Sequence, residues 1–232
     1  MNDYSILLFT TISIALIHTL SGPDHYLPFI VLAKAKKWRL PKTLFITFIC
    51  GVGHVGSSLL IGYTVVFLGW NLAKVNLFEN LRASWSSWAF ICLGFGYTLW
   101  SLYLLTKNRT HRHFDLDDPD EVYVYSHQHE GLVNPKKRFR VTPWVLFIVF
   151  VGGPCEPLIP LLLYPAIQHS MIHTVQISIV FTLTTLAVML SVVTLGYLGF
   201  QLFSSQFMHQ YSNLLAGITL LCSGLAMVFL GL

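Results

Sequence analysis

Long apolar runs, separated by short polar stretches, are the first pattern along this chain. There are six of them, at residues 6–33, 44–70, 88–105, 144–167, 174–203 and 211–232. Their lengths suit the about 20 helical residues that cross a hydrocarbon core, and none shows the alternation of a β-barrel strand. The pattern therefore predicts an all-α integral membrane protein with six transmembrane helices.

Two of these runs are interrupted by residues that disfavour a helix. The first run contains "GPDHYLP" at residues 22–28, and the fourth contains "GPCEPLIP" at residues 153–160. Proline lacks a backbone N–H and its ring clashes with the preceding turn, so we expect helices 1 and 4 to be broken near the midplane of the membrane. The predicted helix breaks are at Gly22, Pro23, Gly153, Pro154 and Pro157.

The two interruptions lie at matching places in successive groups of three runs. A weaker echo joins the second and fifth runs, "LIGY" at residues 60–63 and "TLGY" at residues 194–197. Because three is odd, the second group must cross the membrane in the opposite sense. Matching broken helices of inverted repeats form midplane binding sites in transporters. We therefore predict two inverted three-helix repeats, residues 1–105 and 143–232, joined by a loop at residues 106–142.

Composition and charge add an orientation to this picture. Hydrophobic residues make up 54% of the chain and charged residues only 10%, which is unusual for a soluble domain. Twelve of the 14 Lys and Arg residues follow the first and third runs, whereas the second connection holds only Lys74 and Arg82. The positive-inside rule then predicts a multi-pass protein of the cell inner (plasma) membrane, with loops 34–43 and 106–142 cytoplasmic and both termini outside.

The interruptions carry side chains that bind metal ions. On an unbroken helix, His18 and His25 would lie about 10 Å apart along the axis, too far for one ion. The break at Gly22-Pro23 would let the segment unwind and bring both histidines to Asp24. No Lys or Arg lies within the predicted runs to neutralise an acidic side chain. Because ionisable residues inside a membrane are costly and are by default functional or paired, the candidate ligands are His18, Asp24, His25, His54, Cys155 and Glu156.

The chemistry of these ligands narrows the choice of ion. Imidazole, carboxylate and at most one thiolate suit nickel, cobalt, zinc or iron(II) better than copper(I) or an alkaline-earth ion. Asp24 would either ligate directly or orient a histidine by a hydrogen bond. His54 could instead hydrogen-bond across helices, and Cys155 could be a small packing residue. The other cysteines form no CxxC pair and are assigned to packing: Cys50, Cys92 and Cys222.

The loop at residues 106–142 contains two His-X-His pairs around an acidic run. Such a loop would collect divalent metal loosely on the cytoplasmic side, or serve only as a solvated polar connection. Its histidines are His111, His113, His127 and His129.

Three short motifs resemble a known family. "HTLSGPDH" at residues 18–25, "GHVGSS" at residues 53–58 and the Gly-Pro-Cys break resemble the nickel/cobalt transporter group of the lysine-exporter superfamily. That group includes NicO-type exporters, the membrane-bound urease accessory protein H and sulfite-exporter-like proteins. The resemblance implies a two-repeat transporter with His18, Asp24, His25 and His54 in the metal path. Five residues separate the first histidine from the Asp-His pair, where the nickel/cobalt permeases typically have four.

The sequence thus predicts a transporter of a divalent transition-metal cation and not an enzyme. Nickel or cobalt is the expected cargo, with zinc or iron as alternatives, export as the favoured direction and no permanent cofactor. Two other functions stay open: export of a sulfur oxyanion or organic anion, and an intramembrane metal-dependent enzyme or assembly factor. The expected partners are the metal ion and the lipid bilayer, without nucleic acid, and the formation of a homo-oligomer is left open.

Overall fold

Helices dominate the computed structural model, which describes residues 3–68, 72–107, 112–115, 123–126, 141–153, 155, 157–167, 170–202 and 206–230. Within these residues the fold is all-helical apart from one pair of short strands. Eight α-helices and one short 3-10 helix follow each other along the chain: α1 (Asp3–Ser21), η1 (Pro23–His25), α2 (Leu27–Ala35), α3 (Leu40–Leu68), α4 (Leu72–Lys107), α5 (Val141–Gly152), α6 (Leu158–Ile167), α7 (Met171–Leu202) and α8 (Gln206–Leu230).

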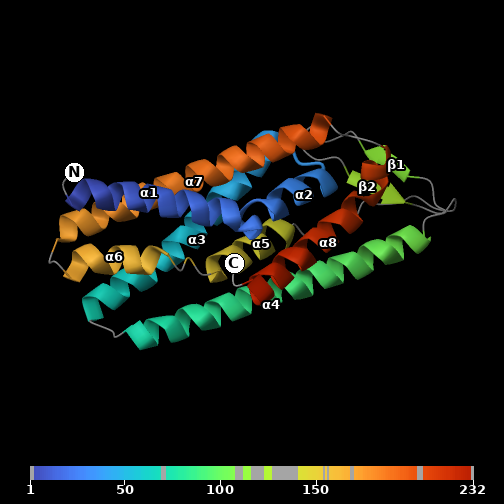
Figure 1. Ribbon diagram of the computed structural model, residues 1–232. Helices are drawn as coiled ribbons and strands as arrows, with labels where there is room; N and C mark the ends of the chain where they lie inside the picture. Colours follow the sequence, from blue (N-terminus) through green and yellow to red (C-terminus); the bar gives the residue numbers. More distant parts are fainter. Residues whose placement is uncertain are drawn as a thin grey trace.

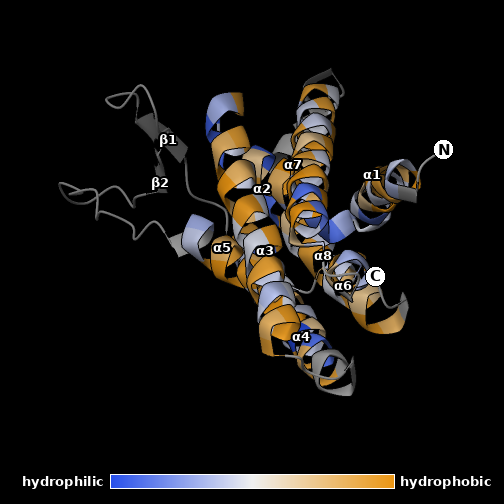
Figure 2. Ribbon diagram, turned by 90° about the vertical axis from the view of Figure 1, so that its left-hand side faces the viewer, coloured by the Kyte–Doolittle hydropathy of each residue, from blue (hydrophilic) through white to orange (hydrophobic). Residues whose placement is uncertain are grey.

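Five of these helices are long and apolar enough to cross a membrane. Their spanning parts are Tyr4–Ser21, Leu40–Leu68, Leu77–Thr106, Met171–Gly199 and Tyr211–Phe229. Hydrophobic residues recur along all the long helices (Figure 2). Many large apolar side chains are exposed, with Phe9 68% and Phe229 80% exposed. A soluble domain would bury such side chains, so the exposed apolar surface agrees with a multi-pass membrane protein.

Each interrupted run consists of two helices. In the first, α1 ends at Ser21, directly before Gly22, and α2 begins at Leu27 after the turn η1. In the fourth, α5 and α6 have 12 and 10 residues, so neither is long enough to cross a membrane alone. Pro157 lies in the turn that precedes α6. Pro154 and Glu156 lie outside the described residues.

The long helices lie roughly along one direction, with the broken ones between them (Figure 1). α1 lies beside α7, and α4 lies beside α8. α3 contacts α5, α6 and α7. Glycines allow the closest approach, because a Cβ at Gly94 of α4 would clash with the backbone of α8 at Leu221. Small residues at a helix interface are the usual way to bring membrane helices together.

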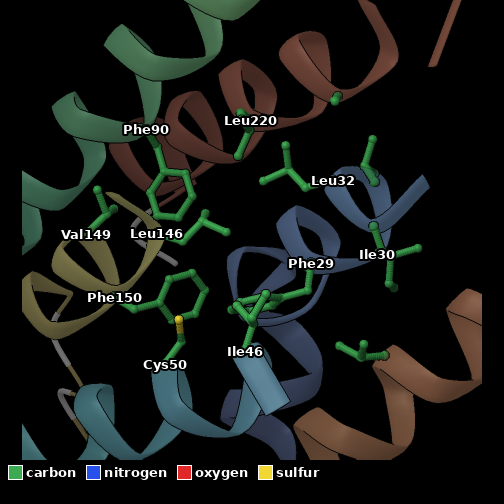
Figure 3. Close-up of a cluster of buried hydrophobic side chains, with 14 of the residues drawn as sticks. Phe29, Ile30, Leu32, Ile46, Cys50, Phe90, Leu146, Val149, Phe150 and Leu220 are labelled. Atoms are coloured by element: carbon green, nitrogen blue, oxygen red, sulfur yellow. The ribbon is translucent and has the colours of Figure 1, made fainter. Parts of the chain in front are cut away.

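Two clusters of buried apolar side chains form the core. The first joins α2, α3, α4, α5, α7 and α8, with Phe29, Phe90 and Phe150 at its centre (Figure 3). The second joins α1, α3, α6 and α7 and includes Val55 and Cys155. His54, the neighbour of Val55, packs its ring against Phe150 of the first cluster. Polar side chains therefore lie where the two apolar clusters meet.

The third span differs from the sequence prediction. α4 begins well before residue 88, and its spanning part includes Glu79 and Arg82. The expectation that no Lys or Arg lies within a span is therefore wrong. A hydropathy pattern ends at charged residues, but Arg82 donates to Glu79 at 2.6 Å, one helical turn away, and this ion pair reduces the cost of both charges inside the span.

A small sheet is present in the loop between α4 and α5. Strands β1 (Arg112–Asp115) and β2 (Tyr123–Ser126) pair antiparallel, with His113 opposite Tyr125. These strands were not expected from the hydropathy pattern of the loop. His111, His127 and His129 lie outside the described residues. The division into 1–105, 106–142 and 143–232 stays a prediction.

Candidate metal centre

Three side chains from distant parts of the sequence meet inside the bundle. His18 lies in the last turn of α1, His54 in the middle of α3, and Cys155 between α5 and α6. Their potential ligand atoms all lie within 4.8 Å of one another, and Cys155 Sγ is 3.7 Å from His18 Nε2. Two ligands of one ion cannot be farther apart than the sum of their bonds to it, about 4.4 Å for a thiolate and an imidazole. The group therefore needs only small side-chain movements to hold one ion.

The orientation of His54 follows from the end of α5. The last carbonyls of a helix have no partner within the helix, and the carbonyl of Phe150 accepts from His54 Nδ1 at 3.1 Å. Because a carbonyl can only accept, Nδ1 carries the hydrogen, and the lone pair of the neutral ring is on Nε2. That atom is buried and has no hydrogen-bond partner in the part of the chain that the structure describes. His54 thus presents a metal-ligating nitrogen.

His25 is held in the same way at the other break. Its Nδ1 lies 3.1 Å from the carbonyl oxygen of Gly22 and 3.2 Å from Asp24 Oδ1, so Nδ1 again donates. Its Nε2 is buried without a partner among the described residues. The His25 ring packs edge-on between His18 and His54, at centroid distances of 4.9 Å and 5.0 Å. His25 therefore lies beside the three-residue group, and Asp24 orients it.

A glycine makes room for the histidine at each break. A Cβ on Gly22 would lie 2.5 Å from His25 Nδ1, and one on Gly153 would lie 3.3 Å from His54 Nδ1. The first distance is too short for any side chain, and the second is tighter than ordinary contact. At each break the glycine therefore lets an imidazole reach a carbonyl oxygen, that of Gly22 or that of Phe150. Each of these oxygens also accepts from a backbone N–H.

The candidate ligands from the sequence have different positions in the structure. His18, His54 and Cys155 form one group, with His25 and Asp24 next to it, whereas Glu156 lies outside the described residues. Sequence reasoning missed Arg82, which contacts the carbonyl oxygen of Gly153 at 2.8 Å. The available signal was the spacing of Glu79 and Arg82, which suits an ion pair on one helix face.

Two imidazole nitrogens and one cysteine sulfur define what this group can bind. Such ligands favour borderline and soft transition-metal ions over magnesium or calcium, which prefer oxygen. His54 and Cys155 are buried, at 3% and 0% exposed, whereas His18 is partly exposed. None of the four cysteines is in a disulfide, and the buried Cys50 packs among apolar side chains of the first cluster. The arrangement is a buried group that can hold a transition-metal ion.

A comparison of the chain with models of known protein families, with curated proteins and with solved structures found no match.

Proposed function

We propose that this protein transports a divalent transition-metal cation across the membrane and that the cation passes through the group His18, His54 and Cys155. The observation that carries the proposal is the convergence of these three ligands within 4.8 Å inside a bundle of membrane-spanning helices. Cys155 belongs to the second apolar cluster and His54 packs against Phe150 of the first, so the ligand group lies where the two clusters meet.

The broken helices support transport over simple metal storage. Discontinuous helices with exposed backbone groups are typical of the substrate sites of transporters, where small movements of half-helices open the site to one side or the other. Here the breaks after α1 and after α5 both border the ligand group, with His18 one turn before the first break and Cys155 within the second.

Reciprocal contacts support the inverted repeat. Gly62 of α3 packs against Leu162 of α6, and Gly196 of α7 packs against Ile30 of α2. If α2 corresponds to α6 and α3 to α7, these are the same contact made twice. α3 with α5, and α7 with α1, form a second such pair. A transporter with this symmetry would alternate by moving one half against the other around the ligand group.

The cargo that we propose is nickel or cobalt, with zinc and iron(II) as alternatives. Imidazole and thiolate ligands suit these ions, and the resemblance of "HTLSGPDH" at residues 18–25 to nickel/cobalt transporters favours the first two. We propose export from the cytoplasm of a cell whose inner membrane holds the protein. The loop at residues 106–142 would then be cytoplasmic and would collect ions through its histidines.

An anion exporter would be a second candidate only if a free cation faced the site. Arg82 is the cation nearest to Cys155 in the described part of the spans, but its guanidinium group already contacts a carboxylate, two hydroxyls and two carbonyls. We therefore favour a cation as the cargo.

The test of the proposed function uses purified protein in liposomes. Uptake of nickel, cobalt, zinc and magnesium into the vesicles is followed beside binding of the same ions in detergent. We expect binding and uptake of at least one transition metal but not of magnesium, and loss of both in His54→Ala. Absence of transition-metal binding would overturn the proposal. A stoichiometric metal that resists chelation, without any uptake, would favour the metal-dependent enzyme instead.

A further inference from the structure

Arg82 occupies an unusual place for a charged residue. It lies within the spanning part of α4, ten residues after the helix begins. Nη1 donates to Glu79 Oε1 at 2.6 Å and to Ser58 Oγ at 3.3 Å. Nη2 donates to Ser57 Oγ at 2.8 Å, and it also contacts the carbonyl oxygens of Gly153 at 2.8 Å and Val151 at 3.3 Å. One guanidinium group thus joins α3, α4 and the end of α5.

The carbonyls that Arg82 reaches are those that the helix break leaves without partners. α5 ends at Gly152, so its last carbonyls cannot bond within the helix. A positive charge at the C-terminal end of a helix is also favoured by the helix dipole. A planar guanidinium group can serve several acceptors at once, which an ammonium group cannot do as well. These contacts compensate for placing a cation in the membrane.

The same contacts connect Arg82 to two of the candidate ligands. Gly153 is two residues before Cys155, and two backbone hydrogen bonds flank the break: Gly153 N to the Phe150 oxygen and Leu158 N to the Cys155 oxygen, both at 3.1 Å. Ser57 accepts from Arg82 and donates to the backbone oxygen of His54 at 2.8 Å. Arg82 therefore holds the segment that carries Cys155 against the helix that carries His54.

From these contacts we propose that Arg82 is a positioning residue that keeps Cys155 turned toward His18 and His54, and that it thereby sets the preference of the site for thiolate-binding metals. This inference rests on the proposed function, because it assumes that the three ligands share an ion. Without Arg82, the Gly153–Cys155 segment loses these contacts to α3 and α4. His54 keeps its hydrogen bond to the Phe150 oxygen, and His18 keeps its edge-on contact with the His25 ring. The site then becomes a pair of imidazoles with a displaced sulfur.

A change in metal preference distinguishes positioning from a merely structural role. Cadmium is a soft ion that depends on the sulfur, whereas nickel binds well to imidazole. We expect Arg82→Met to lower the affinity for cadmium by about 10–100-fold, the range for residues that orient metal ligands. The nickel affinity should fall by less than the lower end of that range. General loss of structure would instead lower both affinities alike.

The experiment measures cadmium and nickel affinities, and the sulfur-to-cobalt charge-transfer absorption of the Co²⁺ form, for purified full-length protein. The variants are Arg82→Met, Cys155→Ser and the double variant. If Arg82 acts through Cys155, adding Arg82→Met to Cys155→Ser should lower the cadmium affinity no further. Lys42→Gln is the control: it also removes a positive charge, but from a place on α3 about 18 Å along the axis from His54.

Arg82→Lys keeps the charge and replaces Arg82→Met in the same measurements if Arg82→Met does not yield folded protein. We expect a weakened sulfur–cobalt absorption, since an ammonium group cannot reach both the carbonyls and the serines. A full absorption band in either folded variant, or additive losses in the double variant, overturns the positioning role. A parent protein that binds none of these metals would instead overturn the proposed function, so the two failures are distinguishable.

Discussion

At the scale of single residues, the site depends on which nitrogen of each histidine is committed to the backbone. His25 and His54 both use Nδ1 to donate to a carbonyl at a helix break, Gly22 in one case and Phe150 in the other. Both Nε2 atoms are then buried, and each carries a lone pair that can bind an ion. Fixing the unused nitrogen in this way orients the ring before any ion arrives, which is how protein metal sites commonly control their ligands.

The first prediction concerns the ligands themselves. His18→Ala or His54→Ala removes one of the three ligand atoms that lie within 4.8 Å. We expect each variant to lose more metal affinity than the about 10–100-fold that follows loss of an orienting residue. Isothermal titration of purified protein measures this. His173→Ala is the matched control, because that histidine stacks on Tyr4 at 4.5 Å, away from the group, and its loss should leave the affinity unchanged.

The second prediction concerns the glycine at the first break. In Gly22→Ala the new Cβ would lie 2.5 Å from His25 Nδ1, so the ring must leave its hydrogen bonds to Gly22 and Asp24. We expect weaker metal binding although every ligand is present. Gly56→Ala serves as control, since nothing lies within 4 Å of that added Cβ. Equal metal affinities for the two variants would show that the position of His25 does not matter for binding.

At the scale of elements, α4 and α8 pack backbone against backbone at three glycines. Cβ atoms at Gly94, Gly217 and Gly224 would each meet the backbone of the opposite helix. Contact through backbone atoms brings the helices closer than side chains would allow, and it increases the packing attraction on which membrane helices depend. α4 also carries Arg82, so this pair determines where the guanidinium group lies relative to the break after α5.

The third prediction tests that packing. Gly94→Ala forces α4 and α8 apart, because the Cβ would lie 2.6 Å from the Cα of Leu221 and backbone cannot rotate away. We expect the free energy of unfolding to fall by about 1–3 kcal/mol, the usual cost of overpacking. Thermal or denaturant unfolding in detergent measures the change. Gly96→Ala, on the same helix but with nothing within 4 Å, should be neutral, and an equal loss in both variants would contradict the explanation.

At the scale of the whole molecule, the buried histidines and Asp24 gather near the breaks, while single buried hydroxyl groups such as those of Ser101 and Ser223 are spread along the helices. Apolar side chains face outward along most helices, and the two buried clusters fill the bundle on either side of the ligand group. Tyr4 at the start of α1 meets Gln176 near the start of α7, so these helices run in parallel. Tyr197 near the end of α7 donates to the backbone oxygen of Trp38, which lies in the basic loop at residues 34–43.

The fourth prediction tests the orientation. The positive-inside rule places the loop between α4 and α5 in the cytoplasm. A Ser126→Cys variant, made in a chain whose four cysteines are replaced by serine, should therefore resist an impermeant thiol reagent added to intact cells. It should react after the membrane is permeabilised. Labelling in intact cells would place this loop outside and would reverse the proposed direction of every span.

The sequence alone determined the membrane class and the places where the first and fourth apolar runs are broken. Hydropathy, glycine and proline act there through local backbone and solvent effects. It also identified His18, His54 and Cys155 as candidates, since a polar side chain in an apolar run is visible without a fold. Only the tertiary structure decided which candidates meet, with His25 held by Asp24 beside the group. It likewise revealed Arg82 as part of a span, because its cost is offset by acceptors on α3 and α5 that are distant in sequence. Local patterns report how each segment meets lipid and water, whereas the partners of a buried polar atom depend on how the helices pack.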